Sequence, residues 1–305
     1  MDINEELVKR LRDILSSERV MIKEPMKLHT TFKIGGPADY LIFPSSLQEV
    51  QQVFAVLNEF CVPFTVLGNG SNVLVRDKGI RGAIVKFNSP FSYIKREDNR
   101  LIVGAGALLK DVAKFAAEAG LSGLEFAVGI PGSVGGAVFM NAGAYGGEMR
   151  DCLFKVRSVT PEGEPAEFAA AALDLGYRQS VFQRNGHAIC EVEMDLTFGD
   201  RAEIFAKMDE FTLKRETKQP LDLPSAGSTF KRPTGYYAGT LIDQTGLKGL
   251  TVGGAQVSEK HAGFVVNKGD ATASDVLNLI AEVQSRVWAA HGVKMQPEVR
   301  IIGEE

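Results

Sequence analysis

Apolar residues recur along the chain with two periods, one typical of helices and one typical of strands. Apolar positions three and four residues apart predict a set of amphipathic helices. These helices cover residues 3–17, a segment that begins at Ser46 and stops before Pro63, and residues 108–119, 201–218 and about 272–291.

The ends of these helices carry their own signals. Ser46 with Glu49 three residues later has the pattern of a capping box, in which each side chain accepts a hydrogen bond from the other residue's backbone N–H. Thr272 or Ser274 is expected to cap the last helix, and Gly292 to end it. Its buried face is predicted to consist of Val276, Leu277, Ile280, Val283, Val287 and Trp288.

Short apolar runs between the helices predict strands. The strands lie at residues 64–67, 83–87, 100–103, 154–160, 188–198 and 296–302. Within residues 188–198, Cys190, Val192, Met194, Leu196 and Phe198 alternate with mostly polar residues, so one face of an antiparallel layer is predicted to be wet. Both patterns together predict an α+β protein.

Length and composition limit the class of protein. A chain of 305 residues suffices for two domains, and a net charge of −4 argues against a nucleic-acid-binding protein. No apolar run is long enough for a membrane span or a signal peptide. Cys61, Cys152 and Cys190 form no pairing motif and indicate reduced core residues in a cytoplasmic protein. Without CxxC, HExxH or spaced histidines, no metal site is expected.

The densest glycine segment covers residues 126–147 and contains seven of the 32 glycines. Apolar residues such as Val134 and Val138 are threaded through it, unlike in a flexible linker. Glycine lets the backbone approach a partner closely. We therefore interpret this segment as ordered backbone whose N–H groups bind something flat or anionic.

A second glycine-rich turn lies between two apolar strands. Gly68 and Gly70 supply the turn, and Ser71 and Asn72 add side-chain donors. The two segments together suggest a phosphate-bearing cofactor, although each alone is also compatible with a plain turn. Neither contains the GxGxxG or GxxxxGK[ST] pattern.

Three other residues are candidates for chemistry, each with a structural alternative. Ser228 could donate or relay a proton, or be an ordinary turn serine. Arg178 could clamp an anion with its planar guanidinium, or lie on a plain surface. Glu298 could hold a proton in a cleft, or form a surface ion pair. Five basic residues flank Ser228 in sequence and could bind a diphosphate: Lys214, Arg215, Lys218, Lys231 and Arg232. A solvated helix end is an alternative explanation for Lys214, Arg215 and Lys218.

Taken together and in this order, the segments resemble the UDP-N-acetylenolpyruvoylglucosamine reductase family, flavoenzymes that make UDP-N-acetylmuramate for peptidoglycan. The chain is similar to the family's shorter form, which lacks a tyrosine-bearing insertion after the arginine motif. The matching segments are residues 30–38, 68–72, 129–137, 141–144, 177–178, 226–231 and 297–300. They extend over most of the chain, and only the stretch at 129–137 is specific by itself.

The helical period near the N-terminus predicts a separate N-terminal helix at residues 1–20. The resemblance implies a vanillyl-alcohol-oxidase-type (PCMH-type) FAD-binding domain at residues 21–200. This domain would have two α/β subregions, about residues 21–90 and 91–200. A smaller α/β substrate-binding domain would follow at residues 201–305, with its C-terminal strand returning to the active site.

The resemblance also implies functions for single residues. Catalysis would involve Arg178, Ser228 and Glu298, and substrate binding would involve Lys218, Lys231 and Arg232. The implied cofactor-binding residues are Gly68, Asn69, Gly70, Ser71, Asn72, Gly129, Ile130, Pro131, Gly132, Ser133, Gly135, Gly136, Asn141 and Ala142.

The implied reaction has two halves. NADPH, as co-substrate, reduces FAD, and the hydride then passes to the enolpyruvyl double bond of UDP-N-acetylglucosamine-enolpyruvate. Ser228 would donate the proton, while Arg178 and a neutral Glu298 would stabilise the enolate charge that develops. We expect a monomeric cytoplasmic enzyme that binds neither nucleic acid nor membrane. The alternatives are an FAD-dependent oxidase with the same cofactor fold and a non-catalytic nucleotide-sugar-binding protein.

Overall fold

The computed structural model describes residues 4–305, which form two compact units. The larger unit contains the N-terminal segment up to Ile22, together with Tyr40–Asn69 and Gly82–Lys214. The smaller unit contains Lys23–Asp39, Gly70–Arg81 and Arg215–Glu305. The chain therefore passes from one unit to the other inside the second glycine-rich turn, between Asn69 and Gly70.

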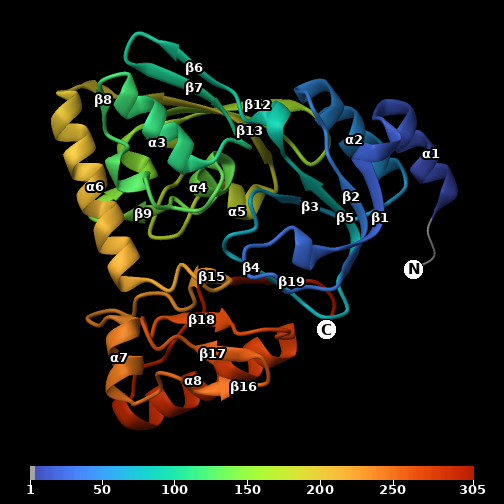
Figure 1. Ribbon diagram of the computed structural model, residues 1–305. Helices are drawn as coiled ribbons and strands as arrows, with labels where there is room; N and C mark the ends of the chain where they lie inside the picture. The colour runs from blue at the N-terminus through green and yellow to red at the C-terminus, as the bar shows by residue number, and fades with distance from the viewer. Residues whose placement is uncertain (1–3) are drawn as a thin grey trace. The chain divides into compact units, whose positions relative to one another are not determined.

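A five-stranded sheet is the centre of the larger unit, and Figure 1 labels its strands β6, β7, β12 and β13. The strand order is β12-β11-β13-β7-β6. All its neighbouring strands pair antiparallel, which confirms the layer expected around residues 188–198. The strands are β6 (Ile94–Glu97), β7 (Arg100–Gly104), β11 (Leu153–Val159), β12 (Pro165–Ala169) and β13 (Ala188–Asp195).

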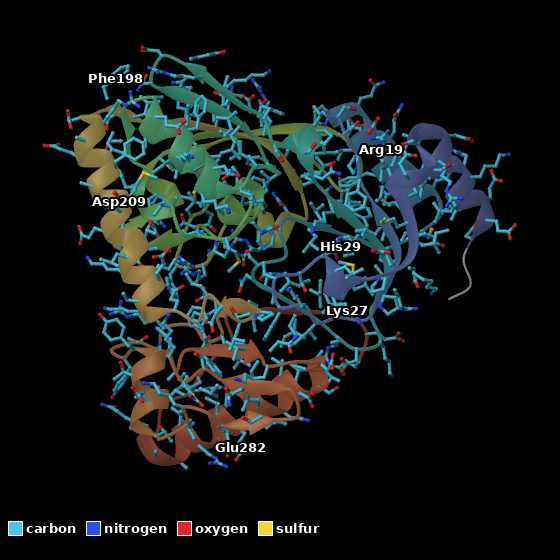
Figure 2. All side chains as sticks on the ribbon, viewed as in Figure 1. Arg19, Lys27, His29, Phe198, Asp209 and Glu282 are labelled. Carbon is cyan, nitrogen blue, oxygen red and sulfur yellow. The ribbon has the colours of Figure 1, made fainter. Side chains whose placement is uncertain are left out.

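The polar face of β13 is less wet than its sequence suggests. Glu193 is buried, and the ammonium group of Lys155 at 3.1 Å and the guanidinium of Arg157 at 3.4 Å compensate its charge. Phe198 was expected on the apolar face, yet its side chain is 63% exposed at the surface of the larger unit (Figure 2). The regular alternation stops because β13 ends at Asp195, and the short β14 (Thr197–Phe198) pairs with β8 (Leu121–Ser122) instead.

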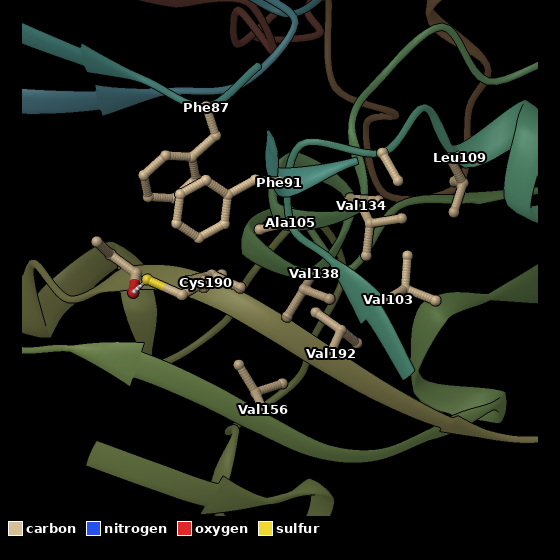
Figure 3. Close-up of a cluster of buried hydrophobic side chains, with 14 of the residues drawn as sticks. Phe87, Phe91, Val103, Ala105, Leu109, Val134, Val138, Val156, Cys190 and Val192 are labelled. Carbon is tan, nitrogen blue, oxygen red and sulfur yellow. Dashed lines mark hydrogen bonds between the residues drawn. The ribbon is translucent and has the colours of Figure 1, made fainter. Parts of the chain in front are cut away.

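Helices and sheet enclose one apolar core in the larger unit (Figure 3). The short helix α4 (Val134–Phe139) lies inside the glycine-rich segment and packs Val134 and Val138 against Val103 and Val192. The other helices with residues in this core are α1 (Glu5–Ile14), α2 (Leu47–Glu59), α3 (Leu109–Glu118), α5 (Phe182–Asn185) and α6 (Arg201–Lys218). The expected start of the first helix at residue 3 lies outside the described residues.

A second sheet has the strand order β1-β2-β5-β3, and the chain passes between the units within β1, β2 and β5. The strands are β1 (Val20–Pro25), β2 (Pro37–Ile42), β3 (Phe64–Leu67) and β5 (Ile80–Lys86).

The N-terminus of α2 was predicted in part. Ser46 caps this helix as expected, because its side chain accepts from the Glu49 N–H. Glu49 does not complete the capping box, because its carboxylate accepts from the Ser45 N–H at 2.7 Å and pairs with Arg19 at 2.6 Å.

The smaller unit has its own sheet, in the order β15-β18-β17-β16, with α8 packed against β16 and β17 (Figure 1). The strands are β15 (Ser225–Ser228), β16 (Thr251–Val252), β17 (Ala255–Val257) and β18 (Phe264–Asn267), and the helices are α7 (Ala238–Gln244) and α8 (Ala273–His291). Thr272 caps α8 in a complete capping box, and Gly292 ends the helix in the left-handed conformation. Trp288 is 58% exposed, so its predicted burial is wrong, whereas Leu279, which the prediction omitted, is fully buried.

A parallel pair of strands joins two distant parts of the sequence within the smaller unit. β19 (Arg300–Ile302), near the C-terminus, pairs with β4 (Val73–Val75), which follows the second glycine-rich turn. This pairing fixes the C-terminal segment beside residues 70–75. None of the helices in residues 4–305 combines the length and the hydropathy that crossing a membrane needs.

Candidate functional site

The two glycine-rich segments meet within the larger unit. The side-chain amide of Asn69 donates to the carbonyl oxygen of Pro131 at 2.6 Å, across 62 positions of sequence. Gly68 lies so close to Ser133 that a Cβ at position 68 would collide with the Ser133 hydroxyl oxygen. Glycine at position 68 is therefore required by a close approach, as its place in the sequence suggested.

Several backbone N–H groups of these segments remain available to a ligand. Within the described part of the chain, the N–H groups of Gly68, Asn69, Gly132 and Ser133 donate to no protein acceptor. By contrast, Val134 and Gly135 donate to the carbonyl oxygens of Ala107 and Ala105, which fixes α4 against the sheet. Clustered amides on glycine-rich backbone are the donors by which proteins bind phosphate groups. This donor set fits the diphosphate of a dinucleotide.

Lys86 adds positive charge near this turn and was not singled out from the sequence. Its backbone pairs in register with Leu67, the residue before Gly68. Burial lowers the pKa of the Lys86 ammonium group to about 8. A lysine that ends an apolar strand gives little signal in sequence, because most such lysines are solvated.

Asn72 and Glu298 are neighbours in the smaller unit. The Asn72 amide donates to the Glu298 carbonyl oxygen at 3.3 Å, and the Arg300 N–H donates to the Asn72 carbonyl oxygen at 3.0 Å. Gly70 has a φ of +67°, and a Cβ there would collide with the His29 carbonyl oxygen. The turn therefore needs glycine at this position to lie against residues 29–30.

Ser228 lies at the end of β15, next to the segment that carries Glu298. The Glu298 N–H donates to the Thr229 carbonyl oxygen at 2.8 Å, and Phe230 forms an isolated antiparallel bridge with Pro297. The Ser228 hydroxyl donates to the Phe230 carbonyl oxygen at 3.3 Å and is only partly buried. The smaller unit thus brings Asn72, Ser228 and Glu298 onto adjoining segments.

The three candidate substrate cations also lie in the smaller unit. The Lys231 N–H donates to the Gln296 carbonyl oxygen at 2.8 Å, beside the segment of Glu298. The Arg232 guanidinium lies 3.9 Å from the centre of the Tyr237 ring, a cation–π contact. Lys218 is the last residue of α6. The pKa of His261 is lowered mainly by burial, and the positive charge of Lys218 adds to this effect.

Arg178 lies in the larger unit, whereas Ser228 and Glu298 lie in the smaller one. Its backbone has a φ of +56°, and Tyr177 and Arg178 form the tip of a tight turn closed by mutual Gly176–Gln179 hydrogen bonds. The guanidinium donates to the Gly143 carbonyl oxygen at 3.4 Å. Non-glycine residues held in this region of φ are uncommon and often belong to functional sites.

Asn141 is fully buried, and both ends of its carboxamide are bound within the protein. Its nitrogen donates to the Gly176 carbonyl oxygen and its oxygen accepts from the Arg150 N–H, each at 3.0 Å. Asn141 therefore ties the glycine-rich segment to the turn of Arg178. The neighbouring Ala142 is partly buried, and its N–H donates to the Ala137 carbonyl oxygen.

Gln183 is a second carboxamide beside Arg178, and the sequence analysis did not single it out. Its nitrogen lies 2.9 Å from the carbonyl oxygens of both Arg178 and Phe139. Glutamine is common on surfaces, so its sequence position alone gives no signal for such a contact.

Known protein families match both the N-terminal and the C-terminal part of the chain. A family model described as FAD binding domain matches residues 38–169, and one described as UDP-N-acetylenolpyruvoylglucosamine reductase, C-terminal domain, matches residues 219–302. The UDP-N-acetylenolpyruvoylglucosamine reductase of Clostridioides difficile (strain 630) is 46% identical over 302 residues, which is 99% of each chain. The enzyme of Geobacillus kaustophilus (strain HTA426) is 49% identical over 305 residues, which is 100% of each chain.

A solved structure shows the same fold. The crystal structure of UDP-N-acetylenolpyruvylglucosamine reductase from Thermus caldophilus is 37% identical, with a TM-score of 0.79 over 92% of this chain and 97% of that chain. The expected α+β fold, a vanillyl-alcohol-oxidase-type FAD-binding domain with a smaller C-terminal domain, is confirmed by this similarity and by the two family models.

Proposed function

The chain belongs to the UDP-N-acetylenolpyruvoylglucosamine reductase family, and from this we propose that it is an NADPH-dependent flavoenzyme of peptidoglycan synthesis. It reduces the enolpyruvyl ether of UDP-N-acetylglucosamine-enolpyruvate to UDP-N-acetylmuramate. The observation that carries this function is the similarity to such reductases over nearly the whole chain, which includes both the FAD-binding and the C-terminal family models.

The glycine-rich backbone is proposed to hold FAD by its diphosphate. When bound, FAD supplies the hydride chemistry between NADPH and the substrate. The diphosphate is proposed to lie on the backbone of Gly68–Asn72 and Gly129–Gly136, and the unused amides of Gly68, Asn69, Gly132 and Ser133 support this role. Asn141 and Ala142 belong to the same site, where the buried carboxamide of Asn141 supports the surrounding loops.

Three side chains are proposed to act on the substrate. Addition of a hydride to an enolpyruvyl ether conjugated with a carboxylate develops enolate charge, which the Arg178 guanidinium stabilises. Glu298 stabilises the same charge if its carboxyl group is neutral. Ser228 donates the proton that completes the lactyl ether. The adjoining backbones of Ser228 and Glu298 support a shared role for these two residues.

Lys218, Lys231 and Arg232 are proposed to bind the diphosphate of the sugar nucleotide. Arginine and lysine donate charge-assisted hydrogen bonds to phosphate oxygens. The backbone bond between Lys231 and Gln296, beside Glu298, supports this role for Lys231. The division into a cofactor domain at residues 21–200 and a substrate domain at residues 201–305 is part of the same proposal.

We further propose that the enzyme is a cytoplasmic monomer. Cys61 is exposed, so its expected place in the core is wrong. Cys152 and Cys190 are buried free thiols, and burial raises the pKa of each to about 12. Such thiols are protonated and unreactive at neutral pH, as expected for a protein of a reducing compartment. Sedimentation of the FAD-bound protein would test the oligomeric state, and a stable dimer would contradict the proposal.

An absorbance spectrum of the purified protein, followed by NADPH titration, tests the function. We expect a bound flavin that NADPH bleaches and that the enolpyruvyl sugar nucleotide restores without oxygen. Recovery only with oxygen, together with oxygen-driven oxidation of an alcohol, would indicate an oxidase. If no flavin stays bound to the protein after FAD is added and the free FAD is removed, a nucleotide-sugar-binding protein is indicated.

A further inference from the structure

The backbone of Arg178 has a conformation that its own residue type does not favour. Arg178 is the second central residue of the turn that Gly176 and Gln179 close, and its φ is +56°. A positive φ at this position of a turn normally selects glycine or asparagine. The side chain of an arginine gains nothing from the strain, so contacts elsewhere must hold the backbone in place.

Gln183 supplies such a contact from outside the turn. Its side-chain nitrogen donates to the Arg178 carbonyl oxygen at 2.9 Å and to the Phe139 carbonyl oxygen at the same distance. A carboxamide nitrogen carries two hydrogens, so one group serves both carbonyls. Phe139 is the last residue of α4, which is packed into the core of the larger unit. Gln183 therefore connects the strained turn to a rigid element.

The same turn is held at a second point, which leaves the guanidinium a defined direction. Asn141 binds the Gly176 carbonyl oxygen, and the Arg178 guanidinium donates to the Gly143 carbonyl oxygen on the glycine-rich segment. A turn tied at Gly176 and at Arg178 has little freedom to rotate. A fixed turn limits where the guanidinium can lie, and its contacts with the Gly143 carbonyl oxygen and, at 5.2 Å, with the Tyr177 ring centre limit it further.

We propose that Gln183 is a positioning residue for the reaction: by binding the Arg178 carbonyl oxygen it holds the left-handed turn that directs the Arg178 guanidinium. This inference rests on the proposed role of Arg178. The amide nitrogen of Gln183 donates to the protein's own carbonyl oxygens, so its role is exerted through Arg178. Its loss changes where the guanidinium lies, not the chemistry that the guanidinium performs.

The test replaces Gln183 and compares the two half-reactions of the FAD-bound enzyme. Gln183→Met keeps the length of the side chain but removes both donors. We expect flavin reoxidation by the enolpyruvyl sugar nucleotide to slow by about tenfold to hundredfold, because small misplacements of a catalytic group have effects of this size. Gln51→Met is the matched control, since Gln51 also donates its side-chain amide to one backbone carbonyl, that of Gly163, in the same unit. This control should react at the wild-type rate.

A double-mutant cycle separates positioning from general damage. In an Arg178→Ala background, Gln183→Met should slow the second half-reaction by less than about twofold, because the group it positions is gone. An undiminished effect of Gln183→Met in that background would overturn the inference. If Arg178→Ala alone leaves the rate unchanged, the proposed role of Arg178 is wrong and the inference falls with it. If Arg178→Ala slows the reaction and Gln183→Met does not, only the inference falls.

A readout without cofactor or turnover completes the test. In the cofactor-free protein, hydrogen exchange at the N–H groups of Gly176 and Gln179 should be faster in Gln183→Met than in Gln51→Met. Gln183→Asn provides a second variant if the methionine variant folds poorly, because its shorter carboxamide keeps the polarity but cannot reach both carbonyls. Unchanged exchange in both Gln183 variants would contradict the positioning role.

Discussion

The hydrogen bond that the Ser228 hydroxyl donates to the Phe230 carbonyl oxygen is long, at 3.3 Å. A proton donor must be able to leave such a bond in order to reach the substrate. In Ser228→Ala we expect NADPH to reduce the flavin at nearly the wild-type rate, while the second half-reaction slows by at least about 100-fold, the usual contribution of a general acid. Rapid mixing that follows flavin absorbance in each half-reaction measures both rates.

Ser225 lies on the same strand as Ser228 and provides the matched control. Ser225→Ala should leave both half-reactions unchanged. Equal losses in the two half-reactions of Ser228→Ala would contradict its assignment as the proton donor.

Single residues were predictable where their role depends on near neighbours in sequence, and less so where it depends on distant ones. Thr272 caps α8 as expected because its partner is Asp275, three residues away. Glu49 departed from the expected capping box because Arg19, 30 residues away, competes for its carboxylate. From the sequence pattern Ser228 could be either a proton donor or an ordinary turn serine, and the family resemblance decided for the proton donor.

At the scale of elements, the contact between the two glycine-rich segments yields a prediction. Alanine at position 68 would press on the hydroxyl of Ser133, which caps α4 by accepting from the Gly136 N–H. We expect Gly68→Ala to weaken FAD binding at least about tenfold, equivalent to about 1.4 kcal/mol, because both segments must separate. Titration of the cofactor-free protein with FAD, followed by flavin fluorescence, measures the affinity.

Space can be restored on the opposite side of the same contact. The double variant Gly68→Ala with Ser133→Gly removes the colliding oxygen, so it should bind FAD more tightly than Gly68→Ala alone. Wild-type affinity in Gly68→Ala would show that the two segments do not need this close approach.

The start of α8 has a second cap that comes from a distant part of the chain. Asp77 accepts hydrogen bonds from the Ala273 and Ser274 N–H groups at 2.7 and 2.9 Å and from the Ser274 hydroxyl at 2.6 Å. Burial alone would raise the pKa of Asp77, but these hydrogen bonds outweigh it and lower the pKa. Asp77→Asn should reduce the free energy of unfolding by about 1–2 kcal/mol at neutral pH, since the amide loses one acceptor.

This effect should depend on pH in one direction. A carboxylate whose pKa is lower in the folded state stabilises the fold above its unfolded pKa, near 4, and loses that contribution as the pH falls further. The difference between wild type and Asp77→Asn should therefore shrink below about pH 4. Trp288, the single tryptophan, lies on α8, so urea unfolding followed by its fluorescence monitors this unit. Asp222→Asn, an exposed aspartate of the same unit, is the control. A difference that grows on acidification would contradict the cap.

Long periodic elements were predictable, and short ones were not. The limits expected for α6 agree with the structure, because eighteen residues repeat the helical period several times. The helix α4 was missed because it has six residues, two of them glycine, within a segment that resembles a loop. The helix α7, with seven residues, is also too short to show a period. Trp288 shows a related limit, since periodicity gives the apolar face of a helix but not how far the core extends over it.

On the scale of the whole molecule, the sequence predicted elements better than their partners. A strand at residues 296–302 was expected from its pattern, but its pairing with β4 joins positions more than 200 residues apart. Strand pairing depends on register and on burial of a face, neither of which a single strand specifies. Each unit contains three separate stretches of the chain, which local sequence patterns do not reveal. The domain limits at residues 21–200 and 201–305 stay a prediction.

Cofactor binding should stabilise the protein through the diphosphate rather than through the ring alone. A ligand that binds only the folded state at about 100 times its Kd adds about 2.7 kcal/mol to the free energy of unfolding. We expect FAD to raise the Tm of the cofactor-free protein by several degrees, and riboflavin at the same concentration to raise it much less. Riboflavin carries the same ring but no diphosphate for the N–H groups of Gly68, Asn69, Gly132 and Ser133 to bind. FAD should also slow hydrogen exchange at residues 129–136 more than within α8. Equal stabilisation by both ligands would mean that the ring, and not the glycine-rich backbone, holds the cofactor.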